Sequence, residues 1–248
     1  MKIVFATHNK GKLREVREIL GEGFEIVSPD DLGHSEDIEE TGNTLAANSL
    51  LKAKYIVDTL GVDCFADDSA LEVEILAGRP GVHTARYAPG EGHDSQANMD
   101  KLLVDMACRE MEASMAREFG LTTVHATRRA RFRTVATLIL DGHIHTFEGI
   151  LNGKISLVKK GDGGFGYDPV FIPERIPQWA CPALPEGSSF TLESDGEGLV
   201  ANWSQLTLAQ LGEEAKNAIS HRGKATRALA KFLLEESAKD STETTPKD

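Results

Sequence analysis

The chain has 248 residues, of which 40% are hydrophobic, and its formal net charge at pH 7 is −12. A chain of this size buries a substantial core as one large domain or two lobes. The negative charge argues against a general surface for nucleic acid or anionic membranes. The three cysteines show no CxxC spacing, and neither a signal region nor a membrane-length apolar run is present. We therefore expect reduced thiols in a cytoplasmic protein.

A short polar turn follows the first apolar segment. Residues 3–6 predict a strand, and residues 13–20 place apolar side chains at helical spacing. A strand that leads through a tight turn into a helix directs free backbone N–H groups toward one point, where an anion binds well. This predicts a phosphate site, with a solvated basic turn as the alternative. The turn consists of Thr7, His8, Asn9, Lys10, Gly11 and Lys12.

Two adjacent carboxylates, Asp67 and Asp68, follow a second apolar run at 62–66 and precede Ser69. Residues 71–75 alternate between apolar and acidic side chains, which predicts a half-buried strand. Acidic groups at the end of a buried strand are costly unless they hold a cation or transfer a proton. Beside a phosphate turn, the pair indicates a magnesium or catalytic site rather than a turn cap.

A further acidic pair, Glu39 and Glu40, precedes a helix predicted at 43–60. These carboxylates are candidates for an additional metal ligand. The alternative is that they only favour the helix N-terminus electrostatically.

A glycine-rich segment at 161–169 predicts a loop that approaches a ligand closely. Phe165 and Tyr167 within it offer flat faces for a nucleobase, a contact that contributes about 1–3 kcal/mol. The alternative is an ordinary turn whose aromatic side chains lie in the core.

A basic segment at 216–224 opens the last predicted helix, and its cationic residues are Lys216, His221, Arg222 and Lys224. Positive charge at a helix N-terminus is unfavourable unless an anion binds there. Such a conflict between local rules is expected at a functional site.

The remaining pattern predicts a helix at 95–107 and two strands at 132–140 and 144–149, joined by a tight turn at Asp141-Gly142. His143 and His145 beside this turn are read as polar side chains on an exposed strand, with metal ligation as the alternative. Hairpins mixed with strand–helix units indicate an α/β fold with a mixed sheet.

These segments together resemble the inosine triphosphate pyrophosphatase family, house-cleaning enzymes also described as dITP/XTP pyrophosphatases. Six family motifs occur in order over most of the first 235 residues. They are T-x-N-x-x-K (Thr7, Asn9, Lys12), E-E-T-G (Glu39 to Gly42), A-D-D-S (Ala66 to Ser69), P-G-x-x-S-A-R-Y (Pro80 to Tyr87), G-G-F-G-Y-D-P (Gly163 to Pro169) and K-x-x-I-S-H-R-G (Lys216 to Gly223).

Some positions depart from the family pattern. About thirty extra residues, 174–207, and a longer segment at 107–129 are the larger departures. The substitutions are His8, Ala46, Ala47, Ala70 and Thr84.

The resemblance implies a two-lobed α/β molecule with an elongated mixed central β-sheet flanked by helices, an active site in the inter-lobe cleft, and a homodimer. It implies a single domain at 1–235 with a surface insertion at 174–207, followed by a polar disordered tail at 236–248. Neither nucleic acid nor a membrane is an expected partner.

The implied reaction is Mg²⁺-dependent attack of water on the α-phosphorus of ITP, dITP or XTP, which releases pyrophosphate and a monophosphate. By the resemblance, Asp68 is the base, and Asp68 with Glu40 holds the metal; the residues themselves do not separate Asp67 from Asp68. Donors at His221 and Arg222 would favour a 6-oxo purine over adenine. The implied substrate-binding residues are Thr7, His8, Asn9, Lys10, Gly11, Lys12, Ser69, Phe165, Gly166, Tyr167, Asp168, Lys216, His221 and Arg222.

Two alternatives remain open from sequence. One is a pyrophosphatase acting on other modified nucleotides, such as pyrimidines, and the other is a non-catalytic nucleotide-binding protein. A kinase is poorly supported, because the chain lacks GxxxxGK[ST].

Overall fold

The computed structural model describes residues 2–90, 94–121, 126–177, 179, 191–194, 199–202 and 206–243. The chain forms two compact units. Unit 1 comprises Met1–Asp68, Thr134–Gly149 and His221–Asp248, and unit 2 comprises Ser69–Arg133 and Ile150–Ser220. Three strands contribute residues to both units: β3 (Cys64–Val73), β5 (Arg129–Leu140) and β6 (His143–Ile155).

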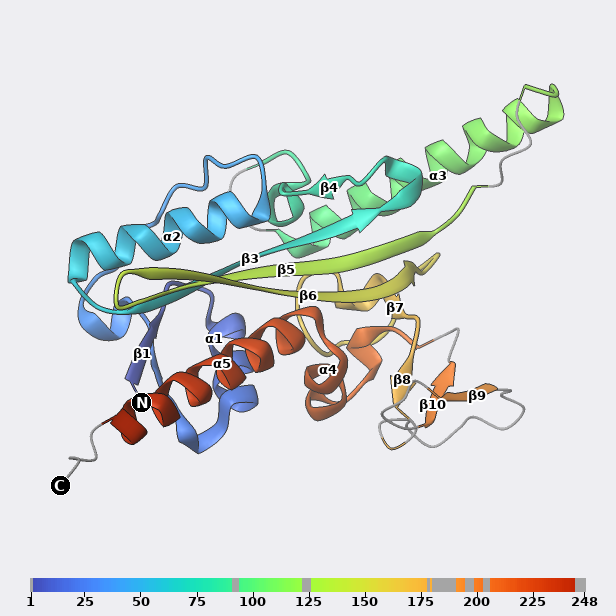
Figure 1. The fold of residues 1–248 in the computed structure, drawn as a ribbon. Helices are drawn as coiled ribbons and strands as arrows, with labels where there is room; N and C mark the ends of the chain where they lie inside the picture. The colour runs from blue at the N-terminus through green and yellow to red at the C-terminus, as the bar shows by residue number, and fades with distance from the viewer. Residues whose placement is uncertain are drawn as a thin grey trace. The chain divides into compact units, whose positions relative to one another are not determined.

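Unit 1 is built on parallel pairing around β1 (Lys2–Phe5). This strand pairs on one side with β2 (Glu25–Val27) and on the other with β3, where Phe5 lies opposite Phe65. The two rings stack at 4.5 Å between centroids. The order of the main sheet is β2-β1-β3-β5-β6-β7, as Figure 1 shows.

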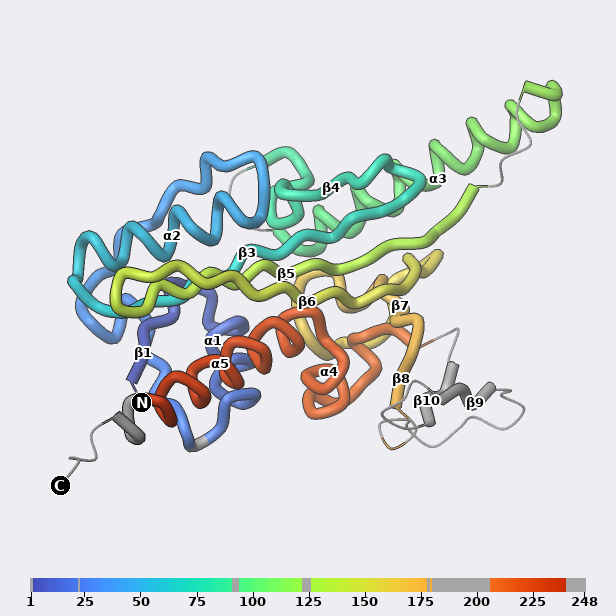
Figure 2. The backbone as a smooth tube through the Cα atoms, in the orientation of Figure 1, coloured from blue at the N-terminus to red at the C-terminus, as the bar shows by residue number. Residues whose placement is uncertain are grey.

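Helices cover both faces of the unit 1 strands. They are α1 (Lys10–Leu20), α2 (Leu45–Leu60) and α5 (His221–Glu243). Alternation along β1 gives each face its own core: Ile3 and Phe5 join α1 and α5, whereas Val4 and Ala6 join α2. Figure 2 shows α1 and α5 side by side.

The predicted hairpin is confirmed. Asp141 and Gly142 connect β5 to β6 and both have a positive φ, 47° and 78°, as expected of a tight hairpin turn.

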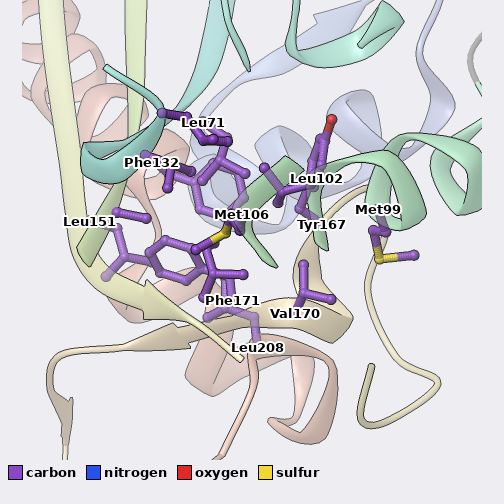
Figure 3. Close-up of a cluster of buried hydrophobic side chains, with 14 of the residues drawn as sticks. Leu71, Met99, Leu102, Met106, Phe132, Leu151, Tyr167, Val170, Phe171 and Leu208 are labelled. Atoms are coloured by element: carbon purple, nitrogen blue, oxygen red, sulfur yellow. The ribbon is translucent and has the colours of Figure 1, made fainter. Parts of the chain in front are cut away.

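Unit 2 continues the sheet with antiparallel pairs. β4 (Pro80–Gly81) pairs with β3, and β7 (Phe171–Pro173) pairs with β6. The core packs against α3 (Ser95–Glu118), and the rings of Phe132 and Phe171 lie 4.5 Å apart (Figure 3). The remaining regular elements of this unit are α4 (Glu213–Ile219) and a small antiparallel sheet of β8 (Ile176–Pro177), β9 (Thr191–Ser194) and β10 (Leu199–Asn202).

Short 3₁₀ helices complete the described elements. They lie at Gly21–Gly23, Asp30–Leu32, Glu74–Leu76, Thr84–Arg86, Asp168–Val170 and Leu208–Gln210. No helix among the described residues combines the length and apolarity needed to span a bilayer.

Three expectations about the elements need correction. Asp67 and Asp68 lie inside one continuous strand rather than at its end, because the polar residues of β3 find partners on both faces. α3 continues to Glu118, past the predicted end at 107. α5 continues through Glu243, so the tail predicted from 236 begins too early; residues 244–248 lie outside the described residues, as does most of the predicted insertion at 174–207.

Candidate active site

The polar turn after β1 is organised by Asn9. Asn9 is the N-cap of α1, and its side-chain Oδ1 accepts a hydrogen bond from the Lys12 N–H at 3.1 Å. Its own N–H donates to Thr7 Oγ1 at 3.2 Å. The predicted strand–turn–helix arrangement is therefore confirmed, and it presents the first N–H groups of α1 together with the Lys12 side chain.

The His8 side chain, in the same turn, contacts a different part of unit 1. Its Nδ1 lies 3.1 Å from Asp30 Oδ1, and its Nε2 lies 3.1 Å from the Glu36 carbonyl oxygen. His8 and the exposed Lys10 also line a cavity of about 450 Å³. Both ring nitrogens of His8 are thus engaged within the protein.

The adjacent carboxylates of β3 lie on opposite faces. Phe65 belongs to the α1/α5 core and Ala66 to the α2 core, so alternation directs Asp67 toward α1 and α5 and Asp68 toward α2. Asp68 Oδ2 accepts a hydrogen bond from Asn48 Nδ2 of α2 at 3.0 Å.

Asp67 is the centre of a buried ion-pair network. Lys12 Nζ donates to its Oδ1 at 2.8 Å, and Arg222 Nε donates to its Oδ2 at 2.9 Å. Arg222 Nη1 also pairs with Glu15 of α1. The side chains of Asp67 and Arg222 are each 3% exposed and thus shielded from water, whereas that of Lys12 is 17% exposed.

The two carboxylates differ in acidity for physical reasons. Burial acts to raise the pKa of Asp67, but the charges of Lys12, Arg222 and Lys52 outweigh it and hold the pKa well below its ordinary range. Burial also raises the pKa of Asp68, and there the neighbouring Glu40 carboxylate adds to the rise while Lys52 only partly opposes it. Asp67 is therefore a fixed counter-ion, whereas Asp68 is suited to accept a proton.

Lys52 links the acidic segment to α2. Its ammonium lies 2.5 Å from Glu40 Oε1, and its charge also acts on Asp68. No group of three or more acidic, His or Cys side chains suited to a metal gathers among the described residues. Asp68 and Glu40 are the two carboxylates predicted as metal ligands, and the Glu40 charge acts on the pKa of Asp68.

The glycine-rich loop of unit 2 is organised by Asp168. Its Oδ2 accepts hydrogen bonds from Lys216 Nζ at 2.7 Å and from the Phe165 N–H at 2.8 Å. Lys216 Nζ lies 4.2 Å from the centroid of the Phe165 ring. Gly164 has a φ of +73°, and a Cβ there would lie 2.1 Å from Asp168 Oδ2, so only glycine permits this loop.

The two aromatic residues of the loop differ in position. Phe165 is 36% exposed and offers a face for stacking. Tyr167 is 4% exposed, lies in the unit 2 core and donates its hydroxyl hydrogen to the Thr84 carbonyl at 2.9 Å. The Tyr167 side chain lies among core residues (Figure 3), so Phe165 is the better placed of the two rings for stacking.

The start of α5 carries Arg222, which was predicted to contact a purine. Its guanidinium is buried and pairs with Glu15 and Asp67. His221 is 7% exposed at the start of α5, where a Cβ on Gly149 of β6 would lie 2.0 Å from the His221 carbonyl oxygen. That close approach fixes the beginning of the helix against the strand.

Sequence reasoning did not include two residues of this constellation, Asn48 and Glu15. Asn48 lies four residues before Lys52 on α2, and these two polar residues interrupt the apolar face of the predicted helix, which was a usable signal for Asn48. Glu15 lies among other charged residues of α1, and no pattern distinguishes it.

Comparisons with known proteins identify similar sequences and folds. A dITP/XTP pyrophosphatase of Porphyromonas gingivalis is 44% identical over 233 residues, which cover 94% of this chain and 97% of the relative. The structure of the Staphylococcus aureus Ham1 protein matches with a TM-score of 0.66 at 32% identity, covering 95% of this chain and all of the other. A HAM1 protein from Coxiella burnetii matches with a TM-score of 0.70 at 28% identity over 95% and 99% of the two chains.

These likenesses confirm the predicted fold class, a mixed sheet flanked by helices, and the resemblance inferred from the motifs. The model of the Ham1 family matches residues 3–185 and 198–232. The stretch left unmatched between these ranges, 186–197, is shorter than the insertion predicted at 174–207. Since the matched residues make up most of its length, the chain belongs to the Ham1 family.

Proposed function

We propose that this protein hydrolyses non-standard purine nucleoside triphosphates, namely ITP, dITP and XTP, to the monophosphate and pyrophosphate. Such an activity would remove these nucleotides from the cytoplasmic pool. Relatives named dITP/XTP pyrophosphatases, 41% and 44% identical to this chain, support the proposal.

The observation that carries the proposal is the divergence of Asp67 and Asp68. When the environments of two neighbouring carboxylates shift their pKa values in opposite directions, the two groups are suited to different roles in acid–base chemistry. Asp68 is the proposed general base that orients and deprotonates the attacking water. Asp67 is the proposed counter-ion that keeps Lys12 in place.

The phosphates would be bound by the turn before α1. Lys12 supplies a positive charge, and the N–H groups at the start of the helix supply oriented donors. Ser69, next to Asp68 in β3, would add a hydrogen bond. Neutralising and positioning the triphosphate lowers the barrier more than any covalent step would.

Mg²⁺ is the proposed cofactor, with Asp68 and Glu40 as its protein ligands. A magnesium ion is commonly held by one or two carboxylates together with substrate phosphates, which matches this donor set. When bound, it would neutralise charge on the phosphate oxygens. Lys52, paired with Glu40 at 2.5 Å, would hold that ligand in position.

The base would be held by the loop in unit 2. The exposed ring of Phe165 offers a stacking surface, and the Lys216–Asp168 pair offers fixed polar groups of both signs. Donors in this region would favour a 6-oxo purine, because adenine presents an amino group where hypoxanthine and xanthine present an acceptor. Placement of the whole site in an inter-lobe cleft stays a prediction.

A homodimer is the proposed assembly. The resemblance implies it, and α3 carries a stripe of exposed apolar side chains that is suited to a protein partner. The stripe consists of Val104, Met111 and Met115 of α3 and of Phe119, its C-cap residue, each at least 50% exposed.

A substrate panel tests the proposal. Pyrophosphate release is measured from ITP, dITP, XTP, ATP, GTP and modified pyrimidine triphosphates, each with and without Mg²⁺. We expect release from the first three, in the presence of Mg²⁺, with a catalytic efficiency at least about 10²-fold above ATP, a typical discrimination between substrates that differ at one polar group. Comparable efficiency on ATP contradicts the purine assignment, a preference for pyrimidines supports a different pyrophosphatase, and binding without release indicates a non-catalytic protein.

A further inference from the structure

His8 connects the phosphate turn to a segment that carries a proposed metal ligand. The ring lies between Asp30 of the 3₁₀ helix at Asp30–Leu32 and the backbone of Glu36, with both nitrogen–oxygen distances at 3.1 Å. Its side chain is 26% exposed, so the contacts are partly shielded from water. Four residues after Glu36 the chain reaches Glu40.

Both partners of the ring are acceptors. A carboxylate oxygen and a backbone carbonyl oxygen have no hydrogen to give, so each hydrogen bond needs an N–H on the histidine. A neutral imidazole has one N–H and therefore completes only one of the two bonds, whereas the imidazolium completes both. The charge also strengthens the bond to Asp30.

We propose that His8 is a positioning residue that clasps residues 30–36 to the phosphate turn and thereby orders Glu40. The inference deepens the proposed function and rests on it for its effect on catalysis. It replaces the expectation that His8 contacts substrate, since both ring nitrogens are already engaged.

The segment depends on such contacts for its order. Residues 34–42, all described, form neither helix nor strand. Side-chain contacts hold them instead: Tyr55 donates its hydroxyl hydrogen to Glu36 Oε2 at 2.8 Å, and Lys52 pairs with Glu40. The His8 bond is the contact that ties the backbone of this segment to the turn that contains Lys12.

Basic and acidic residues are equal in number in the cavity beside His8, so the clasp depends on the two individual contacts of the ring rather than on the net charge around it. The cavity beside the ring is lined by Lys10, Arg14 and Arg17 on the basic side and by Glu18, Asp30 and Asp31 on the acidic side. Arg17 is paired with Asp31, and Arg14 lies 3.8 Å from Glu18. Asp30, the remaining acidic group, is the one that bonds to His8.

Loss of the clasp in His8→Asn leaves Glu40 less well ordered, so the apparent affinity for Mg²⁺ falls.

The experiment compares wild type with His8→Asn and, as the matched variant, His143→Asn, which alters an exposed histidine of β6 in the same unit. Amide hydrogen exchange of residues 34–40 is recorded at neutral pH. This readout does not depend on catalysis, so it tests the clasp even when the proposed activity fails. Turnover of ITP is measured at subsaturating and at saturating Mg²⁺.

We expect faster amide exchange of residues 34–40 in His8→Asn than in wild type. We expect the wild-type to His8→Asn ratio of kcat/KM to be about threefold to tenfold at subsaturating Mg²⁺, the scale of one hydrogen bond. Saturating Mg²⁺ should reduce the ratio, and His143→Asn should behave as wild type. Amide exchange in residues 34–40 that is unchanged in His8→Asn overturns the proposal. A ratio that stays constant with Mg²⁺ assigns His8 a merely structural role and also overturns it.

Discussion

Replacing each carboxylate of the Asp67-Asp68 pair by asparagine should separate structure from chemistry. The two side chains have the same size and neighbouring places in β3, yet they face different partners. We expect Asp67→Asn to lose stability and Asp68→Asn to lose turnover.

The stability effects should have opposite signs. Asp67 is 3% exposed between Lys12 and Arg222, and removing one partner of a buried ion pair costs about 3–5 kcal/mol. In a chain of this length that corresponds to a fall in Tm of about 6–20 °C. Burial instead penalises the charge of Asp68, so Asp68→Asn should leave the Tm unchanged or raise it slightly.

The dependence on pH provides an internal check. The pKa of Asp67 is held below its unfolded value, mainly by Lys12 and Arg222 against the opposing effect of burial. Its ion pairs therefore contribute stability at neutral pH, and that contribution is lost as pH falls below about 4. The difference in unfolding free energy between wild type and Asp67→Asn should shrink on acidification.

The rate effect belongs to Asp68. Loss of a positioned general base costs about 10²–10⁴-fold in turnover, and removal of a proposed metal ligand adds to this. Pyrophosphate release from ITP at saturating Mg²⁺ and thermal unfolding are measured on the same samples. If Asp68→Asn keeps near-normal turnover while Asp67→Asn is stable and inactive, the base has been assigned to the wrong neighbour. If both variants remain active, the pair is structural and the mechanism is wrong.

Two further substitutions test the phosphate turn and the glycine-rich loop. Lys12→Ala should raise KM for ITP and lower kcat, because it removes a contact made to substrate and transition state alike. The control Lys54→Ala, on the exposed face of α2, should change neither constant. An unchanged KM for Lys12→Ala speaks against phosphate binding by Lys12. Gly164→Ala should raise KM for ITP and lower the unfolding free energy by about 1–3 kcal/mol, since its Cβ would lie 2.1 Å from Asp168 Oδ2 at a φ of +73°. Gly23→Ala, where a Cβ meets nothing within 4 Å, should leave both KM and the unfolding free energy unchanged. If Gly164→Ala also leaves both unchanged, the position of Asp168 does not depend on this loop geometry.

Local signals in the sequence were sufficient for several elements. The turn after β1 follows from an apolar run, a short polar turn and an amphipathic helix, all within about twenty consecutive residues. The hairpin follows from Asp141-Gly142, since both positions need a positive φ that these residues tolerate. The loop at Gly164 follows from the glycine-rich composition of residues 161–169, because glycine readily adopts a positive φ. Each of these features depends on backbone preferences of neighbouring residues, which a sequence displays directly.

The positions of the charged side chains depended on long-range packing. Alternation along β3 indicates that Asp67 and Asp68 face opposite ways, but only the tertiary structure assigns α1 and α5 to one face and α2 to the other. The partner of Asp67, Arg222, is 155 residues away, and that of Arg222, Glu15, is 207 residues away. A sequence pattern does not report such distances, so Arg222 was expected at a ligand although the fold pairs it internally.

The same distinction separates Phe165 from Tyr167. Both are aromatic residues in one glycine-rich loop, and the sequence treats them alike. The fold buries Tyr167 against Thr84, 83 residues earlier, and leaves Phe165 exposed beside Lys216. The sequence by itself determined which residue types gather near the site, because motifs and turns are local. Only the tertiary structure decided which of them are buried in ion pairs or core contacts, because burial and charge pairing are set by segments that meet after folding.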